Sequence, residues 1–325
     1  MKEVKEKLNI GIIGVGHMGQ YHVNVVASML NYNLVGIYDE NIQLAQEIAN
    51  KFEIKAYLNL DDLLKDCESV TIAVPTVLHY ETAKRALLAN CHVLVEKPIT
   101  ETVEQATELC DIAKKHNKIL QVGHVERFNG AVIELKKIVT NPLLIEAKRL
   151  APFSSRIKDV GVILDMLIHD LDIVLNLVDS PLKKSFAVGS KVETNNEDIA
   201  QITLVFENGC IATITGSRVS QKKERSLMIQ QDKSYIYLNY SNQDIEIHRQ
   251  ASSAYLMTKE QIRYSQESFV ENLFVHKDNP LKSEHQHFFD CIRNGVEPLV
   301  PNDKDIETLS IALSSLKEIA ENFSN

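Results

Sequence analysis

The sequence predicts an α/β protein in two domains, the first built on a doubly wound parallel sheet and the second an α/β domain with a large, mostly antiparallel open sheet. From residue 8 to about 124, short apolar runs alternate with longer amphipathic segments, as buried parallel strands alternate with helices. From residue 183, β-branched runs follow one another without helices between them, so their strands should pair antiparallel. We therefore expect domains at residues 1–124 and 125–325.

In the first domain, the predicted strands are short apolar runs, most of them followed by a helical pattern. Strands separated by helices form a doubly wound sheet, because the crossovers place helices on both faces. The expected strands are Asn9–Gly14, Asn33–Tyr38, Ile54–Ala56, Ser69–Val74, His92–Glu96 and Ile119–Gly123.

In the second domain, a helix at about 128–139 leads to a strand, and a further helix ends near Leu177. Two helices at about 282–294 and 303–322 close the chain. The expected strands are Leu143–Leu150, Lys183–Val188, Ala200–Glu207, Ile211–Ser217, Leu227–Gln231, Tyr235–Leu238 and Ile245–His248.

Composition argues against nucleic-acid-binding, membrane and secreted proteins. The formal net charge of -9 argues against general affinity for nucleic acid, which needs a basic face. No apolar stretch is long enough to span a membrane, and the charged start MKEVKEKLN lacks the apolar region of a secretory signal. The cysteines form no C-x-x-C pair, so we expect reduced thiols, no metal and a cytoplasmic protein. They are Cys67, Cys91, Cys110, Cys210 and Cys291.

The first predicted strand runs into a glycine-rich turn. Gly14-x-Gly16-x-x-Gly19 follows the strand and precedes a helical pattern, which is the context of a Rossmann dinucleotide site. Gly14 allows a tight turn, Gly16 lets the backbone approach a pyrophosphate, and Gly19 lets helix and strand pack closely. The N–H groups at the helix N-terminus would bind the phosphates.

An acidic residue completes the dinucleotide pattern. Asp39 ends the second strand, twenty residues after Gly19, where its carboxylate can accept hydrogen bonds from the adenosine ribose. Glu40 follows, and two carboxylates would repel the additional phosphate of NADP. The sequence therefore favours NAD as the cofactor.

Three further residues have the types needed for proton transfer. Lys97 follows the fifth strand directly, and ligands of doubly wound sheets bind beyond the carboxyl ends of the strands. Asp165 and His169 are four residues apart, so they share one face of a predicted helix. His169 could also be a satisfied core histidine.

Cations gather just before this helix. Lys148, Arg149, Arg156 and Lys158 lie within eleven residues and would suit a phosphorylated substrate. Lys148 and Arg149 are adjacent on a strand and should face opposite sides, so Arg156 and Lys158 are the stronger candidates. They could equally lie in a solvated loop.

These motifs, taken in order, resemble the Gfo/Idh/MocA family of oxidoreductases over nearly the whole chain. The similarity lies in GVGHMG, AVPTVLHYETAKRALLANCHVLVEKP, VGHVERFN and GVILDMLIHDLD. The resemblance implies a Rossmann domain, an α/β domain often used for oligomerisation, and a catalytic set of Lys97, Asp165 and His169. Thr76 stands where the family more often has Asn, which puts one cofactor contact in doubt.

The family pattern implies hydride transfer between a sugar alcohol and NAD, with either His169 or Lys97 as the base and Asp165 orienting the pair. His169 is preferred because its pKa normally lies near neutrality. The expected cofactor residues are Gly14, Gly16, His17, Met18, Gly19, Asp39, Val74, Pro75, Thr76, His79, Glu96 and Lys97. The expected substrate residues are Lys97, His124, Arg127, Asn129, Arg156, Lys158, Asp165 and His169.

Within the family, VGHVERFN and RIKDVGVILDMLIHDLD are most similar to members that convert UDP-N-acetylglucosamine to its 3-keto form. The expected partners are a PLP-dependent aminotransferase in lipid A diamino-sugar synthesis and further copies of the chain, in a homodimer or homotetramer. Dehydrogenases of UDP-N-acetylglucosaminuronate or inositol are alternatives. A non-catalytic dinucleotide-binding regulator is the alternative from another class.

Overall fold

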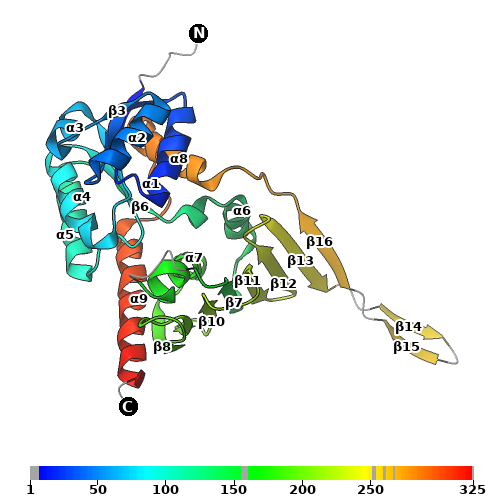
Figure 1. The fold of residues 1–325 in the computed structure, drawn as a ribbon. Coiled ribbons are helices and arrows are strands. Elements are labelled where there is room, and N and C mark those ends of the chain that lie inside the picture. The colour runs from blue at the N-terminus through cyan, green and yellow to red at the C-terminus, as the bar shows by residue number, and fades with distance from the viewer. Residues whose placement is uncertain (1–6, 155–159, 251–253, 259–260, 266–267, 324–325) are drawn as a thin grey trace, which may run out of the picture. The chain divides into compact units, whose positions relative to one another are not determined.

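The computed structural model describes residues 7–154, 160–250, 254–258, 261–265 and 268–323. The chain forms two compact units (Figure 1). Unit 1 contains Met1–Phe128 and Asn279–Ser310, and unit 2 contains Asn129–Asp278 and Ile311–Asn325. Among the described helices, none combines the length and the apolar character that crossing a bilayer requires.

Unit 1 contains a six-stranded parallel sheet in the order β3-β2-β1-β4-β5-β6. The order reverses between β1 and β4, and open α/β sheets bind ligands at such a reversal, beyond the carboxyl ends of the strands. The strands are β1 (Leu8–Ile13), β2 (Tyr32–Tyr38), β3 (Lys55–Ala56), β4 (Ser69–Ile72), β5 (His92–Glu96) and β6 (Leu120–Gly123).

Helices connect these strands, and their ends follow local sequence signals. Asn41, Asn59 and Thr102 accept hydrogen bonds from backbone N–H groups at the starts of α2, α3 and α5. The helical segments are α1 (His17–Ser28), α2 (Ile42–Phe52), α3 (Leu60–Asp66), η1 (Thr76–Leu78), α4 (His79–Leu88), α5 (Val103–Lys115), η2 (Val125–Phe128) and α8 (Pro280–Asn294).

Unit 2 is built on an eight-stranded sheet in the order β16-β13-β12-β11-β7-β10-β9-β8, in which only β7 and β10 pair parallel among the described strands. A separate hairpin joins β14 to β15. The strands are β7 (Pro142–Leu150), β8 (Leu182–Ser190), β9 (Ile199–Phe206), β10 (Ile211–Ser217), β11 (Glu224–Gln231), β12 (Ser234–Asn239), β13 (Asp244–Gln250), β14 (Ala254–Thr258), β15 (Gln261–Ser265) and β16 (Ser268–Leu273).

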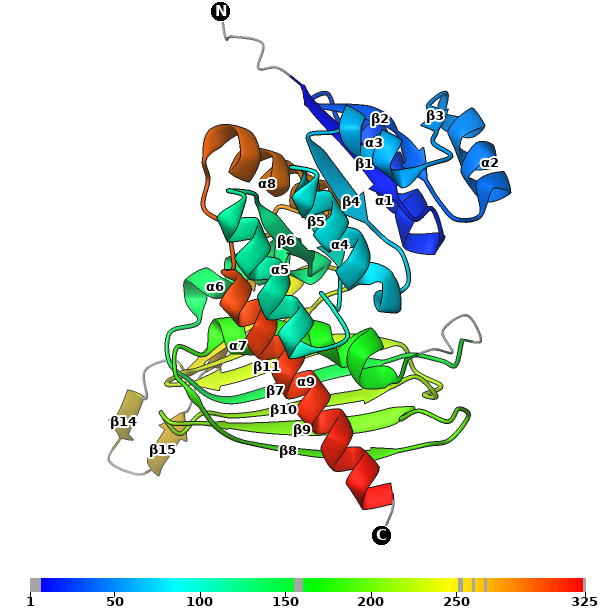
Figure 2. The ribbon, with the colours of Figure 1, turned by 90° about the vertical axis from the view of Figure 1, so that its left-hand side faces the viewer.

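Helices cover one face of this sheet (Figure 2). They are α6 (Gly130–Ile138), η3 (Ile163–Leu167), α7 (Ile168–Leu177) and the C-terminal part of α9 (Asn302–Phe323). Their apolar side chains form one buried core with alternate residues of the strands. On the opposite face, Phe186 and Val188 of β8 are more than half exposed, at 52% and 59%.

The predicted α/β class and both sheet types are confirmed. The units differ from the predicted domains in two respects, because residues 125–128 and residues 279–310 belong to unit 1 although both were assigned to the second domain. Apolar residues explain both differences, since Leu281 and Phe289 of α8 lie in the same buried core as α1 and β1, and Val125 packs against that core. The strands β14, β15 and β16 were not predicted.

Helix α8 also brings polar side chains into the interior of unit 1. His285 Nε2 lies 2.9 Å from His22 Nδ1, and His22 Nε2 lies 2.8 Å from Glu96 Oε1. Burial lowers the pKa of His285 well below its usual value. Glu284 is fully buried beside this chain of hydrogen bonds, and neither carboxyl oxygen has a hydrogen-bond partner among the described residues.

We expect Glu284→Gln to change how stability depends on pH. Burial raises the pKa of Glu284 well above its usual 4.5, and Glu96 raises it further. Above pH 4.5 the unfolded chain therefore releases a proton that the folded protein keeps, so wild-type stability falls as the pH rises towards the folded pKa. The unfolding free energy of the variant relative to wild type should therefore be higher at pH 8 than at pH 4, because glutamine does not titrate.

Urea unfolding at the two pH values measures this difference. Glu297→Gln, at an exposed position, is the matched control. An equal effect of Glu284→Gln at pH 4 and pH 8 would show that the buried carboxyl does not titrate as described.

Candidate active site

The glycine-rich turn of unit 1 has the geometry that the motif predicts at two positions. Gly14 has a φ of +85°, and a Cβ there would lie 2.7 Å from the Ala73 carbonyl oxygen. A Cβ on Gly19 would lie only 1.9 Å from the Gly14 carbonyl oxygen, so a larger residue would separate α1 from β1. Both glycines are therefore required for the packing of the turn.

Gly16 differs from its neighbours because its surroundings are open. No described atom lies within 4 Å of the position that a Cβ would take. Gly16 precedes α1, whose first turn carries no acidic side chain and presents its backbone N–H groups at this point. His17 and Met18 are exposed in that turn. An open backbone cradle at a helix N-terminus suits a pyrophosphate.

Asp39 is held at the end of β2 by backbone hydrogen bonds. Its Oδ2 accepts from Val15 N at 2.8 Å, and its Oδ1 accepts from Asn41 N at 2.8 Å. The carboxylate is thereby fixed beside the glycine turn with lone pairs left for a ribose hydroxyl. Glu40 is exposed next to it.

A cavity of about 810 Å³ joins these features within unit 1. Gly14, Gly16, Asp39, Val74 and Pro75 all line it, together with Glu40. The open cradle, the helix N-terminus and the fixed carboxylate fit the pyrophosphate and adenosine of NAD. When bound, NAD would supply the hydride acceptor.

His79 links two loops near this cavity. Its Nδ1 lies 2.7 Å from the Pro98 carbonyl oxygen, and its Nε2 lies 2.9 Å from that of Val74. Burial lowers the pKa of His79, which favours the neutral ring with one N–H. A neutral ring donates its one N–H to only one of the two carbonyls and packs against the other, so we expect His79 to position the Val74 and Pro98 segments. Thr76, at the start of η1, is half-buried.

Glu96 and Lys97 follow one another at the end of β5. Burial by itself would raise the pKa of Glu96, but the hydrogen bond from His22 and the charges of His22 and Lys97 bring the pKa below its usual value. Glu96 is therefore a buried carboxylate beside the half-buried Lys97. The charge of Lys97 thus helps to keep the Glu96 carboxylate ionised.

The other two members of the predicted catalytic set belong to unit 2. Asp165 lies in η3 and His169 in α7, and both side chains are half-buried. Asp170, next to His169, is fully buried and receives two hydrogen bonds from Arg149, Nε to Oδ2 at 2.7 Å and Nη2 to Oδ1 at 3.0 Å. This bidentate pair attaches α7 to β7.

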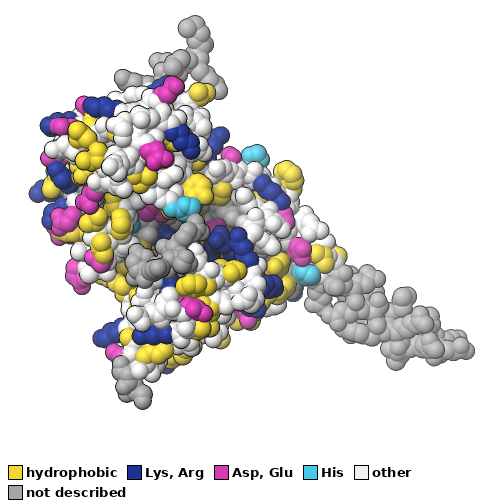
Figure 3. All heavy atoms as spheres, viewed as in Figure 1, with side chains coloured by type: hydrophobic (Ala, Val, Ile, Leu, Met, Phe, Trp, Pro, Cys, Tyr) yellow, Lys and Arg dark blue, Asp and Glu magenta, His cyan; other side chains and the backbone are white. Residues whose placement is uncertain are grey.

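Lys148 and Arg149 face opposite sides of β7, as predicted. Lys148 is exposed, whereas Arg149 is 2% exposed and paired with Asp170. Arg149 therefore serves the fold of unit 2. Arg156 and Lys158 lie outside the described residues. In unit 1, positive and negative side chains are interspersed over the surface that Figure 3 shows.

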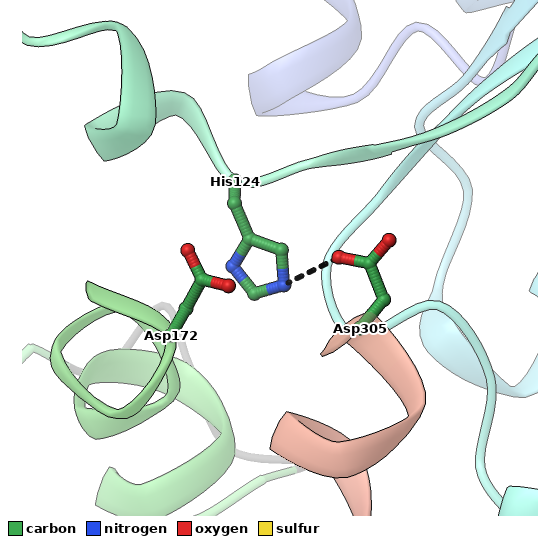
Figure 4. Close-up of side chains that lie close together, drawn as sticks. All are labelled: His124, Asp172 and Asp305. Atoms are coloured by element: carbon green, nitrogen blue, oxygen red, sulfur yellow. Dashed lines mark ion pairs between the residues drawn. The ribbon is translucent and has the colours of Figure 1, made fainter. Parts of the chain in front are cut away.

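Two predicted substrate residues of unit 1 meet a carboxylate that was not predicted. Arg127 Nη2 donates to Asp305 Oδ1, and both side chains are buried. His124 Nε2 lies 3.9 Å from the same oxygen. A dashed line joins the His124 and Asp305 side chains in Figure 4. Asp305 comes from the start of α9, 178 residues after Arg127. No local pattern could indicate this pairing.

Asn129 lies at the start of unit 2 and caps α6. Its Oδ1 accepts from Ala131 N at 3.1 Å, and its Nδ2 donates to the Tyr240 carbonyl oxygen at 3.1 Å. These bonds give Asn129 a place in the fold, and its contact with a substrate stays a prediction. An asparagine before a helical pattern is itself a sequence signal for such a cap.

Comparison with known proteins matches two consecutive segments of the chain to family models. Residues 8–124 match the model of an oxidoreductase family with an NAD-binding Rossmann fold, and residues 130–237 match the Gfo/Idh/MocA C-terminal domain. The chain belongs to the Gfo/Idh/MocA family. The resemblance found in the sequence is thereby confirmed.

Named relatives of this Gfo/Idh/MocA protein are sugar dehydrogenases. The UDP-N-acetylglucosamine 3-dehydrogenase of Acidithiobacillus ferrooxidans is 33% identical over 246 residues, which cover 75% of this chain and 78% of the relative. A solved structure of the enzyme from that organism has a TM-score of 0.87 and 29% identity, with 96% and 98% of the two chains covered. Glucose-6-phosphate 3-dehydrogenase of Bacillus subtilis is 29% identical over 248 residues, 68% of this chain and 73% of the relative.

This Gfo/Idh/MocA protein is therefore an NAD-binding dehydrogenase that acts on the CH–OH group of a sugar. The cofactor cradle lies in the domain for which the family description names NAD binding.

We expect Gly16→Ala to separate cofactor binding from folding. The added methyl group meets no described atom, so the melting temperature should stay within about 2 °C of wild type. The same methyl group occupies the cradle, so NAD should bind at least about tenfold more weakly, since a backbone that cannot approach the phosphates loses hydrogen bonds. Calorimetric titration with NAD measures the affinity.

Gly19→Ala is the contrasting variant, because its methyl group overlaps the Gly14 carbonyl and should lower the melting temperature as well. Unchanged NAD affinity in Gly16→Ala would place the pyrophosphate elsewhere.

Proposed function

We propose that this protein oxidises the C3 hydroxyl of UDP-N-acetylglucosamine to a ketone with NAD, which prepares the sugar for transamination in lipid A synthesis. The observation that carries the proposal is the similarity to UDP-N-acetylglucosamine 3-dehydrogenase, which extends over 96% of this chain in the structural comparison. The name of the glucose-6-phosphate relative also specifies oxidation at position 3. Two relatives with different sugar substrates thus favour the same position of attack.

The residues of unit 1 would bind the cofactor and stabilise charge. The Gly16 cradle and Asp39 would hold NAD by its pyrophosphate and ribose. The positive charge of Lys97, which follows the buried Glu96, would stabilise the negative charge that develops on the sugar oxygen. Lys97 could also accept the hydroxyl proton if the reaction begins from its neutral form.

The residues of unit 2 would move the proton. Loss of a hydride from C3 leaves a ketone only when the hydroxyl proton also departs, so a base is required. His169 is the preferred base, and Asp165 would orient it. The Arg149–Asp170 pair fixes the helix that carries His169, which limits the directions in which the imidazole can point.

The other expectations about partners stay proposals. The exposed apolar residues on the open face of the unit 2 sheet suit contact with a second copy of the chain, in a homodimer or homotetramer. Light scattering of the purified protein distinguishes these states from a monomer. Pairing with a PLP-dependent aminotransferase follows from the proposed ketone product.

Absorbance at 340 nm tests the proposed substrate. Purified protein, NAD and UDP-N-acetylglucosamine are mixed with a carbonyl trap, because oxidation of an alcohol by NAD is usually uphill at neutral pH. N-acetylglucosamine, UDP-N-acetylglucosaminuronate, glucose 6-phosphate and myo-inositol run beside it. An absorbance increase that occurs only with intact UDP-N-acetylglucosamine supports the proposal. A faster increase with another sugar would identify that sugar as the substrate instead. Tight NAD binding without any turnover would favour a regulator.

We expect His169→Ala to reduce kcat by about 10²–10⁴-fold, the usual contribution of a general base. NAD affinity should stay unchanged, because the cradle and Asp39 lie in unit 1. His276→Ala, at an exposed position of unit 2, is the control. Steady-state turnover and NAD titration of each variant check the expectation. If His169→Ala retains wild-type kcat, Lys97 becomes the base.

A further inference from the structure

The proposed catalytic helix begins with a π-helical turn. In η3, Ile168 N donates to the Ile163 carbonyl, five residues back, instead of four as in an α-helix. Asp165 lies inside this turn, and His169 lies just after it in α7. A π-turn holds one residue more than an α-helical turn, so it changes the angle between side chains before and after it by up to about 100°.

Glu197, which directly precedes Asp198 and β9, binds the start of this turn. The Glu197 carbonyl accepts from Val162 N at 2.9 Å, and its side-chain Oε1 accepts from Ile163 N at 3.1 Å. The first N–H groups of a helix have no partner within the helix, so a fixed acceptor there determines where the helix begins. Glu197 is 6% exposed, which keeps water from replacing it.

The chain just before the turn is fixed by Arg218, which follows β10. Its Nη1 donates to the Val160 carbonyl at 2.7 Å, its Nε to Asp198 Oδ1 at 2.7 Å, and its Nη2 to Thr194 Oγ1 at 2.7 Å. Asp198 is fully buried, and its Oδ2 also accepts from three backbone N–H groups. These groups give Arg218 and Asp198 one arrangement, because a buried charge without its partners would be costly.

Gly161 shows how closely the two segments approach. A Cβ at Gly161 would lie 2.0–2.2 Å from the carboxyl atoms of Glu197, so any side chain there would displace the carboxyl group. The Gly161 carbonyl accepts from Asp165 N at 3.1 Å, which connects this contact to the turn itself. The carboxyl group and the glycine therefore form one close contact at the start of the catalytic helix.

We propose that Glu197 is a positioning residue that holds the turn carrying Asp165 in its π-helical form, with Arg218 and Asp198 fixing the chain before it. The proposal rests on the proposed roles of Asp165 and His169. Without the Glu197 acceptor, the turn relaxes to an α-helical start, and the Asp165 carboxylate rotates relative to the His169 ring. Glu197 itself does not contact the reacting atoms in this proposal.

Two substitutions at Glu197 test the proposal. Glu197→Ala removes the acceptor, so kcat should fall about 10- to 100-fold, as expected for a catalytic group misplaced by about 1 Å. Glu197→Gln keeps an oxygen that can accept from Ile163 N, so its kcat should stay within about threefold of wild type. NAD affinity should be unchanged in both, because Glu197 belongs to unit 2.

Gly161→Ala tests the same contact by changing the residue that packs against the Glu197 carboxyl group. Its methyl group displaces the Glu197 carboxyl, so it should reduce kcat as Glu197→Ala does, and the double variant should be no worse than either alone, because both remove one interaction. Glu207→Gln, at an exposed position of unit 2, is the matched control. Equal losses in Glu197→Ala and Glu197→Gln, in proportion to lost thermal stability, would overturn the positioning role.

Crystal structures of the wild type and of Glu197→Ala provide a readout that does not depend on the substrate. The expected result is an Ile168 N bond to Leu164 O in the variant in place of the bond to Ile163 O. A variant that keeps the π-turn overturns the proposal even if kcat falls. If the wild type oxidises none of the tested sugars, the proposed function fails, and the structures still decide whether Glu197 holds the turn.

Discussion

A carboxylate buried at the carboxyl end of β5 constrains the arrangement of unit 1. Glu96 cannot stay ionised in the interior without partners, because removing a charge from water is costly. His22 donates to it from α1, and His285 supports His22 from α8. The cofactor helix, the strand that precedes Lys97 and a helix from the C-terminal part of the chain are thereby connected, and the charge beside Lys97 is set by residues far away in sequence.

Buried charges are also paired in unit 2, where the pairs consist of arginine and aspartate. Arg149 and Asp170 pair beneath α7, while Arg218 and Asp198 pair beside the start of η3. Both arginines are nearly inaccessible to solvent and each has a carboxylate partner that is fully buried. Breaking such a pair leaves an uncompensated charge, so each pair specifies one position for its helix. The residues proposed to move protons are thus carried by helices that have little freedom.

Local patterns were sufficient where one segment creates a feature by itself. The glycine turn, the acidic end of β2 and the apolar strands depend on neighbouring residues, and the structure contains them near the predicted positions. Lys148 and Arg149 face opposite sides of the sheet because successive side chains of a strand alternate between its two faces. The π-turn was not predicted, because an apolar run in the sequence does not distinguish a π-helical turn from an α-helical turn.

The sequence by itself determined the family, the Rossmann sheet, the NAD cradle and the residue types able to move a proton, because these depend on short motifs and on the period of apolar residues. Tertiary structure alone decided the partners of the buried charges. Asp305 meets Arg127, His285 meets His22, and Glu197 caps Ile163. These contacts join residues 34 to 263 positions apart, and which buried charge receives which partner depends on how the helices pack, which no local pattern records.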